Sequence, residues 1–166
     1  MDNVCLNVVS RGDAPSLIAA NQASKDFHTP WVRPFTDQAA FDLWFDRTIT
    51  GSTVSLVARL VGRDDIVGIV NISEIVMGAF QSGYLGYYGT ARFARQGLMT
   101  QALGLAIHYG FKQLGLHRLE ANIQPENIAS IALVRKLGFG KEGLSPAYLM
   151  INGAWRDHER WALRSG

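Results

Sequence analysis

The stretch Tyr84-Leu-Gly-Tyr-Tyr-Gly-Thr-Ala-Arg-Phe-Ala-Arg-Gln-Gly-Leu-Met-Thr-Gln-Ala-Leu103 contains the pattern that decides the fold. A tyrosine-rich run over residues 83–89 predicts a strand, and the apolar periodicity over residues 98–114 predicts the best helix in the chain. A short polar loop that ends at Gly97 connects the two. The first-turn amides of such a helix lack intrahelical partners and lie at the positive end of the helix dipole. They form a site suited to a phosphate or pyrophosphate.

Two side chains and a glycine of this loop favour an anion site. Arg92 and Arg95 place positive charge beside the helix start, and Gly97 lets the backbone approach a ligand closely. An ordinary loop that enters a helix has the same local pattern, so both interpretations stay open on the local residues. The loop is not a Walker phosphate loop, because Gly-Lys-Ser/Thr is absent, and it is not a Gly-x-Gly-x-x-Gly dinucleotide fingerprint.

Helices and strands are predicted on both sides of this stretch. Asp13-Ala14-Pro15 indicates the start of a helix that ends near Lys25, because the two prolines within residues 27–34 cannot continue it. The other expected elements are an N-terminal strand, a helix from Thr36 with Phe41, Trp44 and Phe45 on its apolar face, a hairpin of strands 54–60 and 66–72, a strand 119–123, a helix 127–137, and strands 148–151 and 155–163 joined by Asn152-Gly153. This order predicts a mixed α/β (α+β) chain with a right-handed crossover between two parallel strands.

Composition indicates one folded domain over residues 1–166. Apolar residues make up 48% of the chain and charged residues 18%, which allows a sizeable core and excludes disordered, collagen-like and coiled-coil chains. The formal net charge is only +2, and no basic run is longer than Arg135-Lys136. Nucleic-acid binding needs clustered positive charge, so we expect no direct contact with nucleic acid.

Cysteine and histidine usage excludes several kinds of site. Cys5 is the one cysteine, so the chain has no internal disulfide framework and no multi-cysteine metal site. The four histidines have no ligand spacing such as His-x3-His, so we expect no metal. No apolar run is long enough for a signal peptide or a membrane span. These features predict a soluble, cytoplasmic protein that does not associate with membranes.

A wider pattern runs through nearly the whole chain in a fixed order. Its segments are Ile66-Val-Gly-Ile-Val-Asn-Ile-Ser73, Tyr84-Leu-Gly-Tyr87, Gly97-Leu-Met-Thr-Gln-Ala-Leu103, His117-Arg-Leu-Glu-Ala-Asn122, Pro125-Glu-Asn-Ile-Ala-Ser130, Lys136-Leu-Gly-Phe139, Glu142-Gly143 and Ile151-Asn-Gly-Ala-Trp-Arg-Asp-His158. In this pattern the sequence resembles the Gcn5-related N-acetyltransferase (GNAT) superfamily, whose signature is Arg/Gln-x-x-Gly-x-Gly/Ala between a strand and a helix. Within it the sequence is most similar to the RimJ/RimL group of ribosomal-protein N-terminal acetyltransferases, specifically the RimJ type.

The resemblance implies a GNAT-like fold, in which helices flank a central, mostly antiparallel twisted sheet with one splayed parallel strand pair. It also implies acetyl-CoA as the cosubstrate. The amides of residues 95–100 would hold the pyrophosphate, the backbone of residues 88–90 would pair with the pantetheine arm, and Asn127 and Ser130 would lie beside that arm and the thioester sulfur. The cofactor-binding residues expected on this basis are Tyr88, Gly89, Thr90, Arg92, Arg95, Gln96, Gly97, Leu98, Met99, Thr100, Asn127 and Ser130.

The sequence departs from the family signature at two positions. Ala94 stands where Arg or Gln is usual, and Met99 stands where Gly or Ala is usual. Met99 is compatible with the RimJ type. Ala94 removes a polar side chain, so part of the phosphate contact is expected to fall to Arg92 or Arg95.

Acetyl transfer from a thioester needs a deprotonated amine, a stabilised carbonyl oxygen and a proton for the departing thiolate. We expect direct attack within a ternary complex, with a backbone amide near Gly89 polarising the carbonyl. Ser130 is the candidate proton donor, and the alternative is a first-turn serine that bonds the backbone. Cys5 is expected to be structural and not an acyl-enzyme nucleophile, because no base lies near it in the sequence.

Several groups are candidates for the general base. Glu120 is one candidate, on the polar face of its strand, and an ion pair with Arg118 is the alternative role for its carboxylate. Further candidates are Glu74, Tyr148, Asp157 and His158, or a water molecule that relays the proton.

The RimJ resemblance implies that the acceptor is the α-amine of a ribosomal protein's N-terminal residue. A small-molecule amine acetyltransferase (for amino acids, polyamines or antibiotics) and a non-catalytic acetyl-CoA-binding module are the alternatives. Acceptor specificity is expected in the loops of residues 27–34 and 74–83, because specificity on a shared fold lies in variable loops. We expect a monomer or a homodimer.

Overall fold

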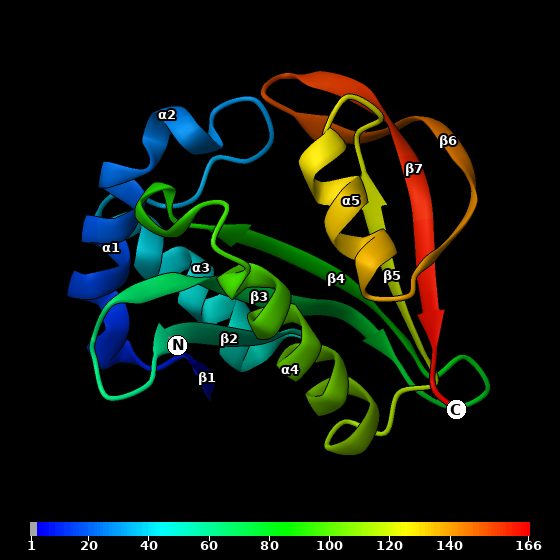
Figure 1. Cartoon of the computed structure of the whole chain (residues 1–166), viewed down its shortest axis with the longest axis horizontal. Helices are drawn as coiled ribbons and strands as arrows, with labels where there is room; N and C mark the ends of the chain where they lie inside the picture. Colours follow the sequence, from blue (N-terminus) through cyan, green and yellow to red (C-terminus); the bar gives the residue numbers. More distant parts are fainter. Residues whose placement is uncertain (1–2) are drawn as a thin grey trace.

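The computed structural model describes residues 3–166, so Met1 and Asp2 of the predicted domain lie outside the described residues. A seven-stranded sheet in the order β1-β2-β3-β4-β5-β7-β6 forms its centre (Figure 1). The strands are β1 (Val4–Val8), β2 (Val54–Leu60), β3 (Ile66–Val76), β4 (Ser82–Gly89), β5 (Arg118–Ile123), β6 (Gly140–Ile151) and β7 (Ala154–Arg164). The helices are α1 (Ala14–Ala23), α2 (Lys25–His28), α3 (Gln38–Thr50), α4 (Leu98–Lys112) and α5 (Ile128–Lys136), with 3-10 turns η1 (Arg11–Asp13) and η2 (Ala91–Phe93).

One pair of neighbouring strands is parallel. β4 pairs with β5 from Ser82 to Tyr84, and every other neighbouring pair in the sheet is antiparallel. The parallel pair needs a long connection, which α4 supplies between the end of β4 and the start of β5. This topology confirms the predicted fold class, a mostly antiparallel sheet with one parallel pair and flanking helices.

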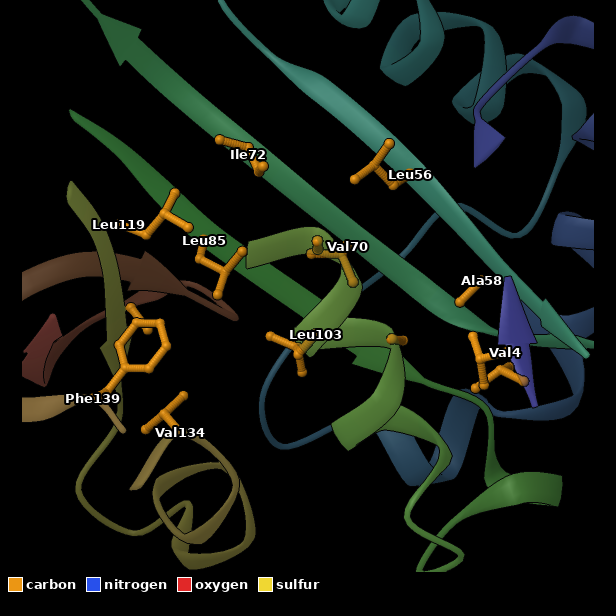
Figure 2. Packing of buried hydrophobic residues seen from close by; sticks show 14 of the residues in the cluster. Val4, Leu56, Ala58, Val70, Ile72, Leu85, Leu103, Leu119, Val134 and Phe139 are labelled. Carbon is orange, nitrogen blue, oxygen red and sulfur yellow. The ribbon is translucent and has the colours of Figure 1, made fainter. Parts of the chain in front are cut away.

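The sheet is buried on both faces around β2 and β3. On one face α4 and α5 pack over residues such as Leu56, Val70 and Leu119, and Figure 2 shows this cluster. On the other face α1 and α3 cover Val57 and Ile69, which alternate with the residues of the first cluster. Burial on both faces explains why β2 and β3 contain nearly continuous apolar runs.

The face of α4 that packs on the sheet has few large side chains. Leu103 is fully buried, and Ile107 and Phe111 are partly buried against the same cluster. The other buried positions of α4 include small residues, Ala102, Ala106 and Gly110. A Cβ at Gly110 would lie 3.3 Å from Leu119 Cδ1, so the small residues let α4 approach the sheet closely.

The sequence patterns placed some boundaries incorrectly. The helix expected from Thr36 begins at Gln38, because Asp37 Oδ1 caps it by accepting from the amide of Ala40 at 2.8 Å. A four-residue helix, α2, follows the predicted end of the first helix. β6 begins eight residues before the strand predicted at Tyr148. It is an edge strand with mostly exposed side chains, so it lacks the apolar alternation that predicts a strand.

Truncation of Leu103 tests the packing of α4 on the sheet. Leu103→Ala removes a fully buried side chain and is expected to lower the free energy of unfolding by about 2–5 kcal/mol. The control is Leu105→Ala on the same helix, where the side chain is 43% exposed and the expected loss is about 0.5 kcal/mol or less. Urea denaturation measures both, and equal losses would contradict this packing.

Candidate active site between β4 and β5

β4 and β5 separate after three paired residues. The last pair is Tyr84 with Glu120, and beyond it the two strands diverge (Figure 1). β3 stays paired with β4 as far as Gly89, and the amide of Thr90 donates to the carbonyl of Val67 at 2.9 Å. Backbone groups of successive residues face alternate sides of a strand. The amide and carbonyl of Gly89, like those of Tyr87, therefore face away from β3 toward the opening.

The N-terminus of α4 lies at the end of β4. Gly97 has a φ of 76° and precedes Leu98, the first residue of the helix. The side chain of Met99 packs against two glycines of the sheet: a Cβ at Gly68 would lie 2.7 Å from its Sδ, and a Cβ at Gly89 would lie 2.9 Å from its Cγ. These glycines leave room for a methionine where the family signature has a small residue. The helix amides are thus held beside the open strand edge.

The two arginines of the loop have different surroundings. Arg92 forms an ion pair with Asp65, with Nη1 2.7 Å from Oδ1, and its guanidinium lies 5.0 Å from the centre of the Phe93 ring. Arg95 is exposed, has a φ of 61° and forms no ion pair within residues 3–166. Arg95 is therefore the arginine whose charge is unshared beside the helix start.

Ser130 and Tyr87 meet across the opening. Asn127 caps α5 by accepting the amide of Ser130 at 3.2 Å, which places Ser130 in the first turn. The hydroxyl of Ser130 is hydrogen-bonded to the hydroxyl of Tyr87 on β4. Burial raises the pKa of Tyr87 to about 12, although its bond to Ser130 lowers it in part, so Tyr87 keeps its proton at neutral pH. The two hydroxyls can supply a proton to a group bound between the strands.

Glu120 lies in an ion-pair network. Its Oε1 lies 2.8 Å from Nη2 of Arg118, and its Oε2 accepts from Nδ2 of Asn122 at 3.3 Å. Arg118 also bonds both carboxylate oxygens of Glu142, at 2.9 and 2.8 Å, and thereby lowers the pKa of Glu142. Glu120 thus has the contacts that the ion-pair alternative requires.

Three of the further candidate bases have hydrogen-bond contacts with other groups of the chain. Tyr148 is hydrogen-bonded at 2.8 Å to Tyr84, whose pKa this bond, with burial, raises to about 12. Asp157 accepts the amide of Ala147 at 2.8 Å. The other two candidates differ in exposure: His158 is buried with Nδ1 2.9 Å from the carbonyl of Arg156, and Glu74 is exposed. Cys5 lies on β1, at the edge of the sheet remote from the opening.

The sequence patterns gave no indication of residues that α1 and α2 bring to the end of β4. His28 Nε2 lies 2.6 Å from the carbonyl oxygen of Gly89, and the ring of His28 packs edge-on against Tyr88 with centroids 5.0 Å apart. Ser24 Oγ accepts the amide of Ala91 at 3.0 Å. These contacts join residues more than 60 positions apart, so no local periodicity predicts them.

Two cavities flank the predicted specificity loop. One, of about 350 Å³, is lined by Asn21, Lys25, His28, Thr29, Val32, Arg33, Pro34 and Thr36. The other, of about 630 Å³, is lined by Trp31, Val32, Arg33, Met150, Ile151, Asn152 and Gly153. Asn152 Nδ2 donates to the carbonyl of Thr29 at 2.8 Å and so fixes the β6–β7 turn to this loop. The lining includes residues of the loop 27–34 and none of the loop 74–83.

Comparison with known proteins agrees with this geometry. Residues 3–140 match the acetyltransferase (GNAT) domain family. The chain belongs to this family. This GNAT domain is 43% identical over 99 residues to the [ribosomal protein uS5]-alanine N-acetyltransferase of Escherichia coli, covering 60% of this chain and 51% of that protein. It is 40% identical over 68 residues to the spermidine N(1)-acetyltransferase of Escherichia coli, covering 41% of this chain and 37% of that one.

Among solved structures, RimJ of Mycobacterium smegmatis in complex with CoA-disulfide superposes on the GNAT domain with a TM-score of 0.86 and 29% identity. The superposition covers 98% of this chain and 82% of that one. In sequence, the matched part spans about half the length of the curated relatives, 55% and 51% of the first two.

Two further findings concern metals and membranes. The described side chains include no cluster of three or more His, Cys, Asp or Glu arranged to hold a metal ion. Within residues 3–166, every helix is too short or too polar to serve as a membrane span.

The free energy of unfolding is expected to fall in acid, because part of it depends on His28 being neutral. Burial lowers the pKa of His28 below its ordinary 6.5, and the bond to Gly89 offsets this only in part. As the pH falls through 6.5, the unfolded chain binds the proton first, so the free energy of unfolding falls. The destabilisation by His28→Gln, which cannot titrate, is therefore expected to shrink between about pH 8 and about pH 5. Urea denaturation measures it, and a pH-independent difference would contradict a buried neutral His28.

Proposed function

We propose that this protein is an acetyl-CoA-dependent N-acetyltransferase that acts by direct attack within a ternary complex. One observation carries the proposal: the open edge of β4 at Tyr87 and Gly89 lies beside the N-terminus of α4. A helix N-terminus binds phosphate groups, and an open strand edge binds an extended amide-containing arm. Acetyl-CoA has both parts. The groups at the start of α4 fit acetyl-CoA, because backbone amides, a left-handed Gly97 and the unpaired Arg95 lie together there.

The binding residues follow from this placement. The amides of Gln96, Gly97 and residues 98–100, with Arg95, would hold the pyrophosphate. Tyr88, Gly89 and Thr90 would lie along the pantetheine arm, with Asn127 and Ser130 of α5 on its other side. Arg92 would contribute less than Arg95, because its guanidinium is held 2.7 Å from Asp65, a carboxylate that it shares with Arg63.

The chemistry needs two groups of this chain at the thioester. The amine nitrogen attacks the carbonyl carbon and releases a proton to water, the carbon–sulfur bond breaks, and the thiolate takes a proton. The amide of Gly89 would donate to the carbonyl oxygen as negative charge develops on it. The hydroxyl of Ser130 would protonate the thiolate and regain a proton through Tyr87, to which it is bonded, and Tyr87 would in turn take back from water the proton that the amine releases. The contact with Tyr87 supports this role, because it directs the Ser130 hydroxyl to a side chain of β4 and not to its own helix backbone.

The proposed acceptor is the α-amine at the N-terminus of a protein, such as the ribosomal protein named for the relative from Escherichia coli. The two cavities support a peptide over a polyamine. Arg33 lines both cavities, Lys25 lines the smaller one, and neither lining includes a carboxylate. A polyamine has several positive charges and would be repelled, whereas a peptide has one ammonium group that acetylation removes, followed by a chain that can be neutral or acidic.

A panel of acceptors tests the proposed function. Thiol release from acetyl-CoA is measured with peptides that begin with Ala or Ser, with spermidine and with free amino acids, and titration calorimetry measures the binding of acetyl-CoA. We expect clear binding and release with peptides. Release with small amines alone would replace the proposed acceptor, binding without release would indicate a non-catalytic module, and absence of binding would contradict the site.

Reversal of one charge tests the basis of acceptor choice. Arg33→Glu is expected to raise kcat/KM for spermidine relative to an Ala-starting peptide by about tenfold, equivalent to about 1.4 kcal/mol of altered charge interaction. Arg47→Glu is the control, because it changes the net charge by the same amount at an exposed position of α3 that does not line either cavity. Equal ratios for both variants would show that cavity charge does not select the acceptor.

A further inference from the structure

His28 is the one described histidine whose side chain contacts the backbone at the opening. It lies at the end of α2 and is only 4% exposed. Its Nε2 lies 2.6 Å from the carbonyl oxygen of Gly89, the last residue of β4. A strand carbonyl in this position would ordinarily accept from the next strand, but β5 has already separated from β4 at this point. A side chain 61 residues away takes the place of a strand partner.

The contact fixes the state of the imidazole ring. A carbonyl oxygen only accepts, so Nε2 must hold the proton and donate it to Gly89. Nδ1 is buried and has no hydrogen-bond partner among residues 3–166, which suits the neutral ring. Two contacts hold the imidazole ring in place. The ring of Tyr88 packs edge-on against it with centroids 5.0 Å apart, and the backbone amide of His28 donates to the carbonyl of Ser24 at 2.9 Å.

The peptide unit that joins Gly89 to Thr90 is clamped at both ends. Its N–H, on Thr90, donates to the carbonyl of Val67 on β3 at 2.9 Å, and its C=O accepts from His28. Beyond it, the amide of Ala91 donates to Ser24 Oγ at 3.0 Å. Glycine has the widest choice of backbone conformations, so a fixed orientation at Gly89 depends on contacts such as these.

We infer that His28 is a positioning residue: by holding the carbonyl of Gly89 it restrains rotation about the Cα of Gly89, and with it the direction in which the Gly89 amide, which belongs to the preceding peptide unit, points into the opening. The inference rests on the proposed function, in which that amide stabilises the carbonyl oxygen of the thioester. A fixed donor stabilises developing charge without reorganising during the reaction. His28 also lines the cavity of about 350 Å³ on the acceptor side, so one side chain contacts both the acceptor cavity and the end of β4.

Two variants separate the hydrogen bond from the packing. His28→Leu still fills the buried site with a side chain but removes the hydrogen-bond donor. The side-chain amide of His28→Gln can still donate to the carbonyl of Gly89. His28→Leu is expected to lower kcat about tenfold, a smaller loss than deletion of an oxyanion-binding donor, while the Kd for CoA changes less than about twofold. His28→Gln is expected to recover most of kcat. His108→Leu, the same substitution at an exposed position of α4, is the control and should not change kcat.

The outcomes distinguish the role from a purely structural one. The inference is overturned if folded His28→Leu keeps full kcat, if His28→Gln is as slow as His28→Leu, or if kcat and CoA affinity fall together. If the unsubstituted protein acetylates no acceptor, the proposed function fails and a second readout tests His28. Amide hydrogen exchange at Thr90, followed by NMR, should accelerate at least about tenfold in His28→Leu but not in His28→Gln. Unchanged exchange at Thr90 in His28→Leu would show that His28 does not hold the peptide unit between Gly89 and Thr90.

Discussion

The early separation of β4 from β5 is the constraint on which the rest of the structure depends. The two strands share three register pairs and then diverge, which leaves the backbone of Tyr87 and Gly89 without a neighbouring strand. Backbone amides and carbonyls away from bulk water need hydrogen-bond partners, so an opening inside a sheet persists only where other groups satisfy or shield its edge. Here the helices that follow the two strands, α4 and α5, place their first turns at this opening.

Packing on both faces keeps the opening in place. On one face Met99 fits over Gly68 and Gly89, and the Ser130 hydroxyl reaches Tyr87. On the other face His28 and Ser24 bond the backbone where β4 ends. In the proposed function the open edge has a donor side, made of helix amides, and an acceptor side, made of the two cavities that Val32 and Arg33 line. Transfer between two bound substrates requires this arrangement, because they must meet at one carbonyl group.

Local patterns predicted the elements that this arrangement uses. The strand–loop–helix stretch, the Asn152-Gly153 hairpin and the helix expected at residues 127–137 each have a signal within a few residues, and the structure confirms these elements. The resemblance implies that Ser130 lies beside the pantetheine arm, and in the structure the Ser130 hydroxyl is bonded to that of Tyr87. The first half of β6 was missed, because an exposed edge strand lacks apolar alternation.

Long-range contacts could not be predicted in this way. His28 and Gly89 are 61 residues apart, and Asn152 and Thr29 are 123 residues apart. The sequence places the positive charge of Arg92 beside the helix start, but in the structure Asp65 of the β2–β3 hairpin forms an ion pair with it. Met99 looked like a departure from the signature, and the two glycines that accommodate it are recognisable only once α4 packs on the sheet. In each case the tertiary fold, and not the local sequence, supplies the partner.

The central claim is that one ligand occupies both the open edge of β4 and the N-terminus of α4. A titration of the isotopically labelled protein with acetyl-CoA, followed by amide NMR, tests it most directly. The account predicts the largest chemical-shift changes at the amides of Tyr87, Gly89 and residues 95–100, together and with one dissociation constant. Changes confined to the cavity of Trp31 and Met150, or different constants for the two groups of amides, would contradict it.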